Sequence, residues 1–132
     1  MKITISTKQG RVPVTILSLE GDLDSSSYLE LIEQARKLFD DGARSLVLDL
    51  ADIGFMSSAG LMAIHTISLM FAGKKPDQSR PFRAINLEHD EEARKHVKLL
   101  CPQPHIEQIL DTVGLKQFFQ IYTDLESAVN SF

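Results

Sequence analysis

Two apolar segments joined by a short polar connection most constrain how this chain can fold. The first, Ser45–Leu50, is apolar except at Ser45 and Asp49. Short, nearly continuous apolar runs are typical of a central strand that is covered on both faces. The second, Leu61–Phe71, is apolar around most of a helical circumference, which predicts a buried helix. A covered strand that leads into a buried helix indicates an α/β protein.

Strand-like and helix-like patterns alternate along the rest of the chain. Further strands are expected at Lys2–Thr7, Val12–Leu19, Val97–Cys101 and Phe119–Tyr122. Further helices are expected at Tyr28–Phe39, from Pro104 to Val113, and after Thr123. Such alternation implies a mostly parallel sheet with right-handed crossovers, to which an opening hairpin adds an antiparallel strand. The predicted fold class is therefore α/β, with a mostly parallel mixed sheet of about five strands and about four helices.

Local signals predict where several helices begin and end. In a capping box, a hydroxyl and a carboxylate satisfy free backbone donors reciprocally. Two pairs fit this pattern, Ser27 with Glu30 and Thr123 with Glu126. Because glycine readily adopts the backbone conformation that ends a helix, stops are expected at Gly42, Gly73 and Gly114.

The segment Lys74–Lys95 does not fit the alternation and is expected to be an insertion after the second central helix. It contains two prolines, several basic residues and an acidic cluster. Structureless loops of this length are uncommon inside compact domains. Either the segment is a mobile excursion, or Leu87–Lys95 forms a short helix that docks on the body of the domain.

Length and composition exclude several classes of protein. A chain of 132 residues has the size of one domain, so residues 1–132 are expected to form a single unit. Its net charge of −4 argues against a nucleic-acid surface, which needs clustered Lys and Arg. The single cysteine, Cys101, excludes an internal disulfide. No apolar run reaches the roughly 18–20 residues that span a bilayer, and no signal region is evident, so a cytoplasmic protein without membrane insertion is expected.

No arrangement of residues predicts catalysis. The histidines lack the i, i+4 spacing with glutamate that binds zinc on a helix. A Gly-rich phosphate loop is missing, and Ser57-Ser58-Ala59-Gly60 does not match the GxSxG nucleophile elbow. Cys101 lies in an expected core strand, where it is interpreted as a small buried hydrophobe. We therefore expect a protein that is not an enzyme and that holds no metal or cofactor.

The connection between the two apolar segments places Ser57 and Ser58 where a strand passes into a helix. The first backbone N–H groups of a helix have no partner within it, so serine is favoured there as a cap. The same N–H groups and the helix dipole favour an anion such as phosphate. From the residues alone a cap is the commoner role, and a phosphorylated switch is the alternative.

Three short motifs occur in order along the chain. They are Gly21-Asp22-Leu23-Asp24, Leu48-Asp49-Leu50 and Phe55-Met56-Ser57-Ser58-Ala59-Gly60-Leu61. Together they resemble a STAS domain of the bacterial anti-sigma factor antagonist family, which has Gly-Glu-Leu-Asp at the first motif and Phe-Met-Asp-Ser-Ser-Gly-Leu, or a Ser-Ser-Ala-Gly-Leu variant, at the last. The sections Val113–Leu115 and Ile121–Ala128 are also similar to the family. The resemblance covers most of the chain except Lys74–Lys95 and implies the STAS fold.

The resemblance implies a binding module that takes part in partner switching. In its unphosphorylated form such a protein binds and sequesters an anti-sigma factor that is also a serine kinase of the histidine-kinase-like ATPase type. The kinase phosphorylates the first serine of the family's Ser-Ser-Gly motif, which aligns with Ser58, and the partner is released. Ser57 stands where the family has aspartate and is therefore the alternative acceptor. A metal-dependent serine/threonine phosphatase is the implied partner that reverses the modification.

The resemblance also predicts the surface that a partner would contact. Its expected members are Asp24, Ser25, Met56, Ser57, Ser58, Ala59, Gly60, Leu61 and Met62. Two rival functions stay open: a non-switching STAS subunit of a larger signalling or transport assembly, and a sensor or hydrolase that binds nucleotide near the strand ends. Both a monomer and a weak dimer are compatible with the sequence.

Overall fold

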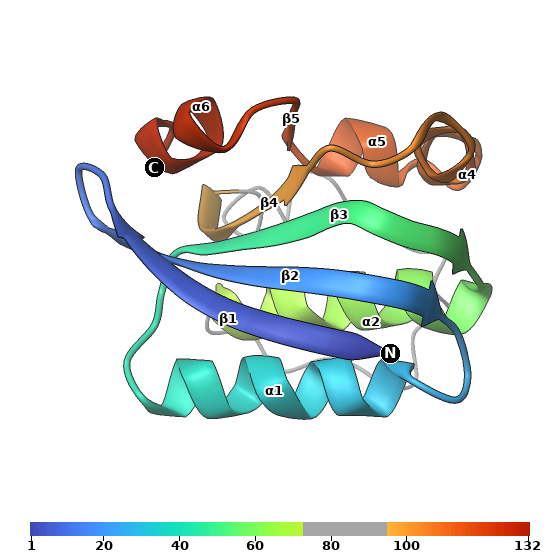
Figure 1. Ribbon diagram of the computed structural model, residues 1–132, viewed down its shortest axis with the longest axis horizontal. Helices are drawn as coiled ribbons and strands as arrows, with labels where there is room; N and C mark the ends of the chain where they lie inside the picture. Colours follow the sequence, from blue (N-terminus) through green and yellow to red (C-terminus); the bar gives the residue numbers. More distant parts are fainter. Residues whose placement is uncertain (73–94) are drawn as a thin grey trace.

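The computed structural model describes residues 1–72 and 95–132, which build a five-stranded sheet flanked by helices (Figure 1). The strands are β1 (Lys2–Gln9), β2 (Pro13–Leu23), β3 (Leu46–Met56), β4 (Val97–Leu100) and β5 (Ile121–Tyr122). They lie side by side in chain order, from β1 to β5. β1 and β2 are antiparallel, and the other neighbouring pairs are parallel. The predicted mixed, mostly parallel sheet and its opening hairpin are confirmed.

Helices follow the strands β2 to β5 along the chain. The described helices are α1 (Tyr28–Asp40), α2 (Ser58–Phe71), α4 (Pro104–Thr112), α5 (Leu115–Phe118) and α6 (Leu125–Asn130). The sequence does not predict α5, because four residues are too few to display helical periodicity. None of the described helices is long and apolar enough to cross a membrane.

The sheet separates two apolar clusters. On one face, Leu48 of β3 belongs to a large core that takes in the buried sides of α1, α2, α4 and α5. On the other face, Val47 of β3 packs in a smaller cluster with Val129 of α6. Side chains alternate along a strand, so neighbouring residues of β3 enter opposite clusters. This two-sided burial of β3 is what the apolar run Ser45–Leu50 predicts.

β2 and β3 extend further than the sequence pattern indicates. The expected strands end at Leu19 and Leu50, whereas the observed strands end at Leu23 and Met56. The register between them shifts twice along these extensions, and Gly21 there has a φ of 116°. Such irregularities break the alternation of apolar residues by which a strand is recognised. The first and last of the three motifs therefore begin inside the sheet.

The predicted capping box at the start of α1 is wrong. Ser27 precedes the helix, but its hydroxyl makes no cap hydrogen bond. It donates instead to the backbone carbonyl of Asp22 at 2.8 Å and accepts the N–H of Asp24 at 3.1 Å. The hydroxyl is thus used to close the turn that enters α1, and Ser27 is buried there with 4 % exposure.

The capping box at the start of the last helix is also wrong, because a neighbouring residue is the cap. α6 begins at Leu125, and the carboxylate of Asp124 accepts the N–H of Ser127 at 2.8 Å, in place of the expected hydroxyl of Thr123. A carboxylate is the stronger cap, since the helix dipole favours negative charge at this end. Hydrogen bonds from Ser127 hold the pKa of Asp124 below its usual value of 3.8.

Glycines stand just after α1 and α4 as predicted. Gly42 and Gly114 have φ values of 106° and 85°, in the left-handed region that favours glycine. The expected stop at Gly73 and the two alternatives for Leu87–Lys95 fall outside the described residues. So does the rest of the predicted insertion, apart from Lys95.

Cys101 lies just beyond β4 rather than within it, which corrects its predicted place in a core strand. β4 ends at Leu100, and Cys101 has a φ of 52°. Its thiol donates to the carbonyl of Thr123 at 3.0 Å. Burial and the charges of Asp49 and Asp124 raise the pKa of the Cys101 thiol. Because the thiolate is the nucleophile, a raised pKa favours the less reactive thiol form of this side chain at neutral pH.

A buried lysine in β4 is the feature of the core that the apolar patterns do not predict. Lys98 is only 4 % exposed. Its ammonium donates to the carbonyl and hydroxyl oxygens of Ser131, at 3.0 and 2.9 Å, and lies 4.6 Å from the centre of the Phe132 ring. Burial lowers the pKa of Lys98 below its usual value of 10.5. The residues that follow α6 therefore cover this cation and satisfy its donors.

We expect Lys98 to make stability depend on pH in the alkaline range. Between its lowered pKa and 10.5 the folded state binds fewer protons than the unfolded state, so the free energy of unfolding rises with pH across this window. Lys98→Met keeps similar bulk and removes the titration. Urea unfolding at a series of pH values up to 10.5 should show wild type gaining stability relative to Lys98→Met. A constant difference between the two proteins would contradict the expectation.

Candidate functional site

Two loops at the carboxyl ends of β2 and β3 carry the predicted site residues (Figure 1). The first loop joins Leu23 to α1, and the second joins Met56 to α2. Leu23 and Met56 are partners in the strand register. The N–H of Ser57 donates to the carbonyl of Leu23 at 3.0 Å, which extends the pairing into the second loop. The sheet therefore fixes the two loops against each other.

Ser57 is the N-cap of α2. Its backbone is extended, with φ −90° and ψ 176°, and its hydroxyl accepts the N–H of Gly60 at 3.4 Å. Its carbonyl accepts the N–H of Leu61 at 3.0 Å, which starts the helical ladder. Both oxygens of Ser57 are thus engaged by the first turn of the helix.

Ser58 is the first residue of α2, and its side chain is exposed. Within the part of the chain that the structure describes, its hydroxyl makes no hydrogen bond. The first turn of α2 contains no acidic residue, so the positive end of the helix dipole is not already compensated there. Of the two adjacent serines, Ser57 caps the helix and Ser58 presents an exposed hydroxyl at its N-terminus.

Gly60 lets the first turn of α2 lie directly on the end of β2. A β-carbon at this position would stand 2.5 Å from the carbonyl oxygen of Leu23, 2.8 Å from the Leu23 Cγ and 3.1 Å from the Met56 Cγ. Real β-carbons essentially never come closer than 3.0 Å to another heavy atom. Glycine is therefore required by close approach, at the position where the last motif has it.

Asp24 organises the first loop. Its carboxylate accepts the hydroxyl of Ser26 at 2.6 Å and the N–H of Ser26 at 2.9 Å. These bonds, led by the one from the hydroxyl, hold the pKa of Asp24 below its usual value of 3.8. Ser25 is exposed beside it. The loop thus presents an ionised carboxylate in a defined turn next to the loop of Ser57 and Ser58.

The structure divides the predicted contact residues into an accessible group and a buried group. The accessible or half-buried members are Asp24, Ser25, Ser57, Ser58, Ala59 and Met62. The buried members are Met56, Gly60 and Leu61. The expectation that Met56 and Leu61 are presented to a partner is wrong, because both side chains are 3 % exposed and lie in the core. They support the loop from beneath.

Phe55 is an exposed apolar residue that the predicted contact surface leaves out. It is 51 % exposed, comparable to Met62 at 48 %. A register shift between β2 and β3 lies beside it, so that Ile53 and Met56 are both buried with two exposed residues between them. Strict alternation would not give this pattern. The available signal was Gly54, because a glycine inside a strand often marks an irregularity.

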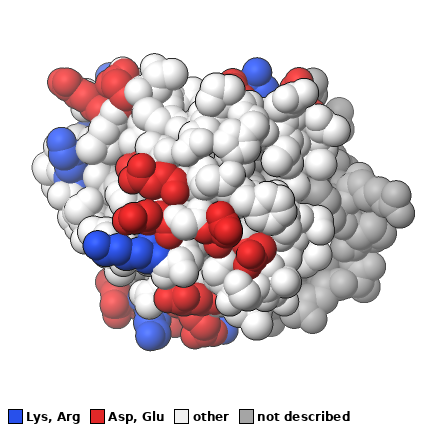
Figure 2. All heavy atoms as spheres, turned by 45° about the vertical axis from the view of Figure 1, so that its right-hand side comes forward, with Lys and Arg blue, Asp and Glu red and all other residues white. Residues whose placement is uncertain are grey.

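Acidic residues predominate at this end of the sheet. Asp22 lies at the end of β2, and Glu20 and Asp52 are opposite each other in the register of β2 and β3. All three are exposed. Figure 2 brings the right-hand side of Figure 1 forward and shows carboxylates gathered in the middle of this face, with fewer basic groups among them. A partner that approaches this face meets a negative potential.

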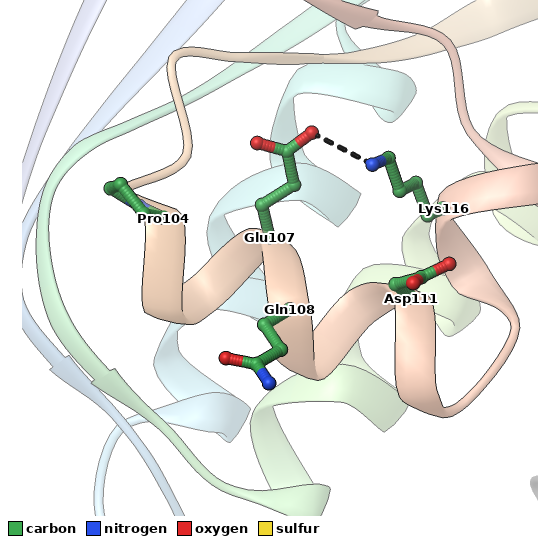
Figure 3. A pocket seen from close by; sticks show the side chains of 5 residues that line it. All are labelled: Pro104, Glu107, Gln108, Asp111 and Lys116. Carbon is green, nitrogen blue, oxygen red and sulfur yellow. Dashed lines mark ion pairs between the residues drawn. The ribbon is translucent and has the colours of Figure 1, made fainter.

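A separate depression of about 300 Å³ lies on α4 and α5 (Figure 3). It is lined by Pro104, Glu107, Gln108, Asp111 and Lys116. The Glu107 carboxylate and the Lys116 ammonium face each other at 3.2 Å, and both are well exposed, so water screens the pair. The depression contains no predicted site residue. Among the described residues, no group of three His, Cys, Asp or Glu side chains could hold a metal ion.

Gly60→Ala is expected to lower the free energy of unfolding by roughly 1–3 kcal/mol, the usual cost of overpacking. The added methyl would collide with the backbone of Leu23 and push α2 off the end of β2. Gly54→Ala is the matched control, because a β-carbon there is 3.7 Å from its nearest neighbour, an oxygen of Asp22. Denaturant unfolding of both variants measures the difference, and equal losses would contradict the close-contact explanation.

Comparison with known proteins gives relatives for this arrangement. The family model of the STAS domain matches residues 5–88, more than half of the chain. The chain is also 24% identical over 133 residues to a protein of Bordetella bronchiseptica named "Putative anti-sigma factor antagonist BtrV". That alignment covers 100% of this chain and 95% of the relative.

Solved structures share the fold at lower identity. An anti-sigma factor antagonist from Mycobacterium paratuberculosis matches with a TM-score of 0.67 at 18% identity, covering 98% of this chain and 93% of that one. SpoIIAA, a Bacillus cell fate determinant, matches in its unphosphorylated form with a TM-score of 0.58 at 15% identity, over 98% and 96% of the chains. Its phosphorylated form gives 0.56 at 16% identity, over 96% of each chain. The predicted fold is therefore confirmed, and the chain belongs to the STAS domain family.

Proposed function

We propose that this protein is an anti-sigma factor antagonist that works by partner switching. In its unphosphorylated form it binds and sequesters an anti-sigma factor with serine kinase activity, and phosphorylation of Ser58 releases that partner. The names of its relative and of the matched structures support this class of function. In this proposal the chain is one STAS domain over residues 1–132, acts in the cytoplasm, and is the substrate of the reaction rather than an enzyme.

The observation that carries the proposal is the division of roles between the two serines. The hydroxyl of Ser57 accepts a hydrogen bond from the first turn of α2, whereas the hydroxyl of Ser58 is exposed. A kinase can reach and modify Ser58 without breaking a hydrogen bond among the described residues. Modification of Ser57 would disrupt the cap, which costs about 0.5–2 kcal/mol when such a residue is lost. Ser58 is therefore the proposed acceptor, and Ser57 the alternative.

The charge of a phosphate explains how the modification could release a partner without unfolding the domain. A phosphoserine carries about −1.5 to −2 charges at neutral pH. At the N-terminus of α2 the helix dipole stabilises an anion by about 0.3–1 kcal/mol. A partner seated on Phe55 at the end of β3 and on Met62 of α2, both exposed apolar residues, would instead have to desolvate that charge. The phosphate would therefore leave the folded domain stable and weaken the binding of the partner.

The proposed partners follow from this chemistry. The kinase is an ATPase of the histidine-kinase-like type that also serves as the anti-sigma factor. A metal-dependent serine/threonine phosphatase removes the phosphate and restores binding. The carboxylates at the ends of β2 and β3 would favour a partner with basic groups around its contact surface.

Substitution of Ser58 tests the switch. The protein is mixed with the kinase that co-purifies with it from the native host and with ATP, and the phosphate is located by mass spectrometry. We expect labelling of wild type and Ser57→Ala at residue 58 and no labelling of Ser58→Ala. Ser58→Glu should weaken partner binding by tenfold or more, which is about 1.4 kcal/mol, measured by titration calorimetry.

Three results would contradict parts of this proposal. Stoichiometric labelling of Ser58→Ala would move the acceptor to another residue, and loss of labelling only in Ser57→Ala would assign it to Ser57. A stable complex with equal affinity for wild type and Ser58→Glu would favour the alternative function, a non-switching STAS subunit of a larger assembly.

A further inference from the structure

The strand that carries the site, β3, runs well past its neighbour β4. β4 pairs only with residues Leu46 to Asp49 of β3. From Leu50 to Met56, β3 has β2 on one side and no strand on the other among the described residues. Backbone carbonyls of Ala51 and Gly54 lie on this stretch, which is exposed at both residues and has no strand of the described chain to hold its outer edge.

Two side chains from the start of α4 donate hydrogen bonds to these carbonyls. The amide of Gln103, the N-cap of α4, donates to the carbonyl of Ala51 at 2.9 Å. The imidazole of His105 bonds to the carbonyl of Gly54 at 2.7 Å, and since a carbonyl only accepts, Nε2 of His105 carries the hydrogen. Ile106, the next residue, is completely buried and anchors this turn of α4 in the large core.

We propose that His105 is a positioning residue for the phosphoacceptor loop, with Gln103 as its support; the proposal rests on the proposed function of Ser58. Gly54 directly precedes the exposed Phe55, and the helix that presents Ser58 begins four residues after it. His105 holds this edge of β3 at the carbonyl of Gly54, close to the end of the strand. It thereby fixes the position from which Phe55 and Ser58 are offered to a partner.

Substitutions of His105 can distinguish a role in positioning the loop from a role in stabilising the whole fold. The side chain of His105 is exposed, so its removal creates no buried cavity. What is lost is one hydrogen bond at a defined place on β3. A residue that restores an N–H donor of similar reach should restore the effect, while a ring without a donor should not. Gln103 shows that a glutamine amide can make an equivalent bond to β3.

The test compares four variants with wild type. His105→Ala removes the donor, His105→Phe keeps a ring without a donor, and His105→Gln restores an N–H. Gln108→Ala is the matched control, an exposed residue of the same helix whose side chain makes no hydrogen bond within the described part of the chain. Backbone amide exchange over residues 53–58 is measured on the isolated proteins, and phosphorylation kinetics are measured with the co-purified kinase.

We expect amide exchange at residues 53–58 to become about five- to tenfold faster in His105→Ala and His105→Phe, the scale on which one net hydrogen bond acts. The kcat/KM of phosphorylation should fall by a similar factor through KM, and His105→Gln and Gln108→Ala should resemble wild type. Unchanged exchange in His105→Ala, or no rescue by His105→Gln, would overturn the proposal. If the kinase does not phosphorylate wild type, the proposed function fails, while amide exchange still decides whether His105 positions the loop.

Discussion

The site depends on a backbone contact between the first turn of α2 and the end of β2. The carbonyl of Leu23 accepts the N–H of Ser57, and the missing side chain of Gly60 leaves room for the helix to lie against that same carbonyl. This contact sets the two loops side by side and aims the N-terminus of α2 at solvent. The exposed hydroxyl of Ser58 and the cap at Ser57 both follow from where this turn of helix is held. The positions of the two loops are thus set by backbone contacts, and the charged side chains add to them without determining them.

The central strand could be predicted from the sequence, whereas the ends of the strands and the two helix caps could not, and both outcomes have physical reasons. The run Ser45–Leu50 identifies the central strand because burial on both faces leaves no room for polar residues. The strand ends could not be read, because register shifts beyond Leu19 and Leu50 remove the alternation that marks a strand. Both capping boxes failed because local competition decides which side chain reaches a free N–H, as Asp124 does in place of Thr123.

In the candidate site, the sequence likewise predicts which residues are present but not which way their side chains point. The motif places Ser57 and Ser58 at a helix start, but only the structure distinguishes the hydrogen-bonded hydroxyl of Ser57 from the exposed hydroxyl of Ser58. The contact surface predicted from the motif included Met56 and Leu61, but both side chains are buried. Phe55, which was left out of that surface, is exposed. His105 and Gln103 lie about fifty positions from the carbonyls they bind, a distance over which sequence patterning carries no information. Local chemistry could be predicted, whereas the direction of side chains and long-range partners required the fold.

The order of the strands determines which face of the sheet can accept substitutions without disturbing the connecting helices. When parallel strands follow one another in chain order with crossovers of one hand, every connecting helix falls on the same face of the sheet. Among the described residues, the opposite face is covered by α6, a helix of six residues that follows the last strand. Ser18 and Asp49, paired on that face at 3.4 Å, stand where its cover gives way to polar surface. Substitutions on this polar side of the sheet can therefore change its charge and shape without repacking the helices that hold the loop of Ser57 and Ser58.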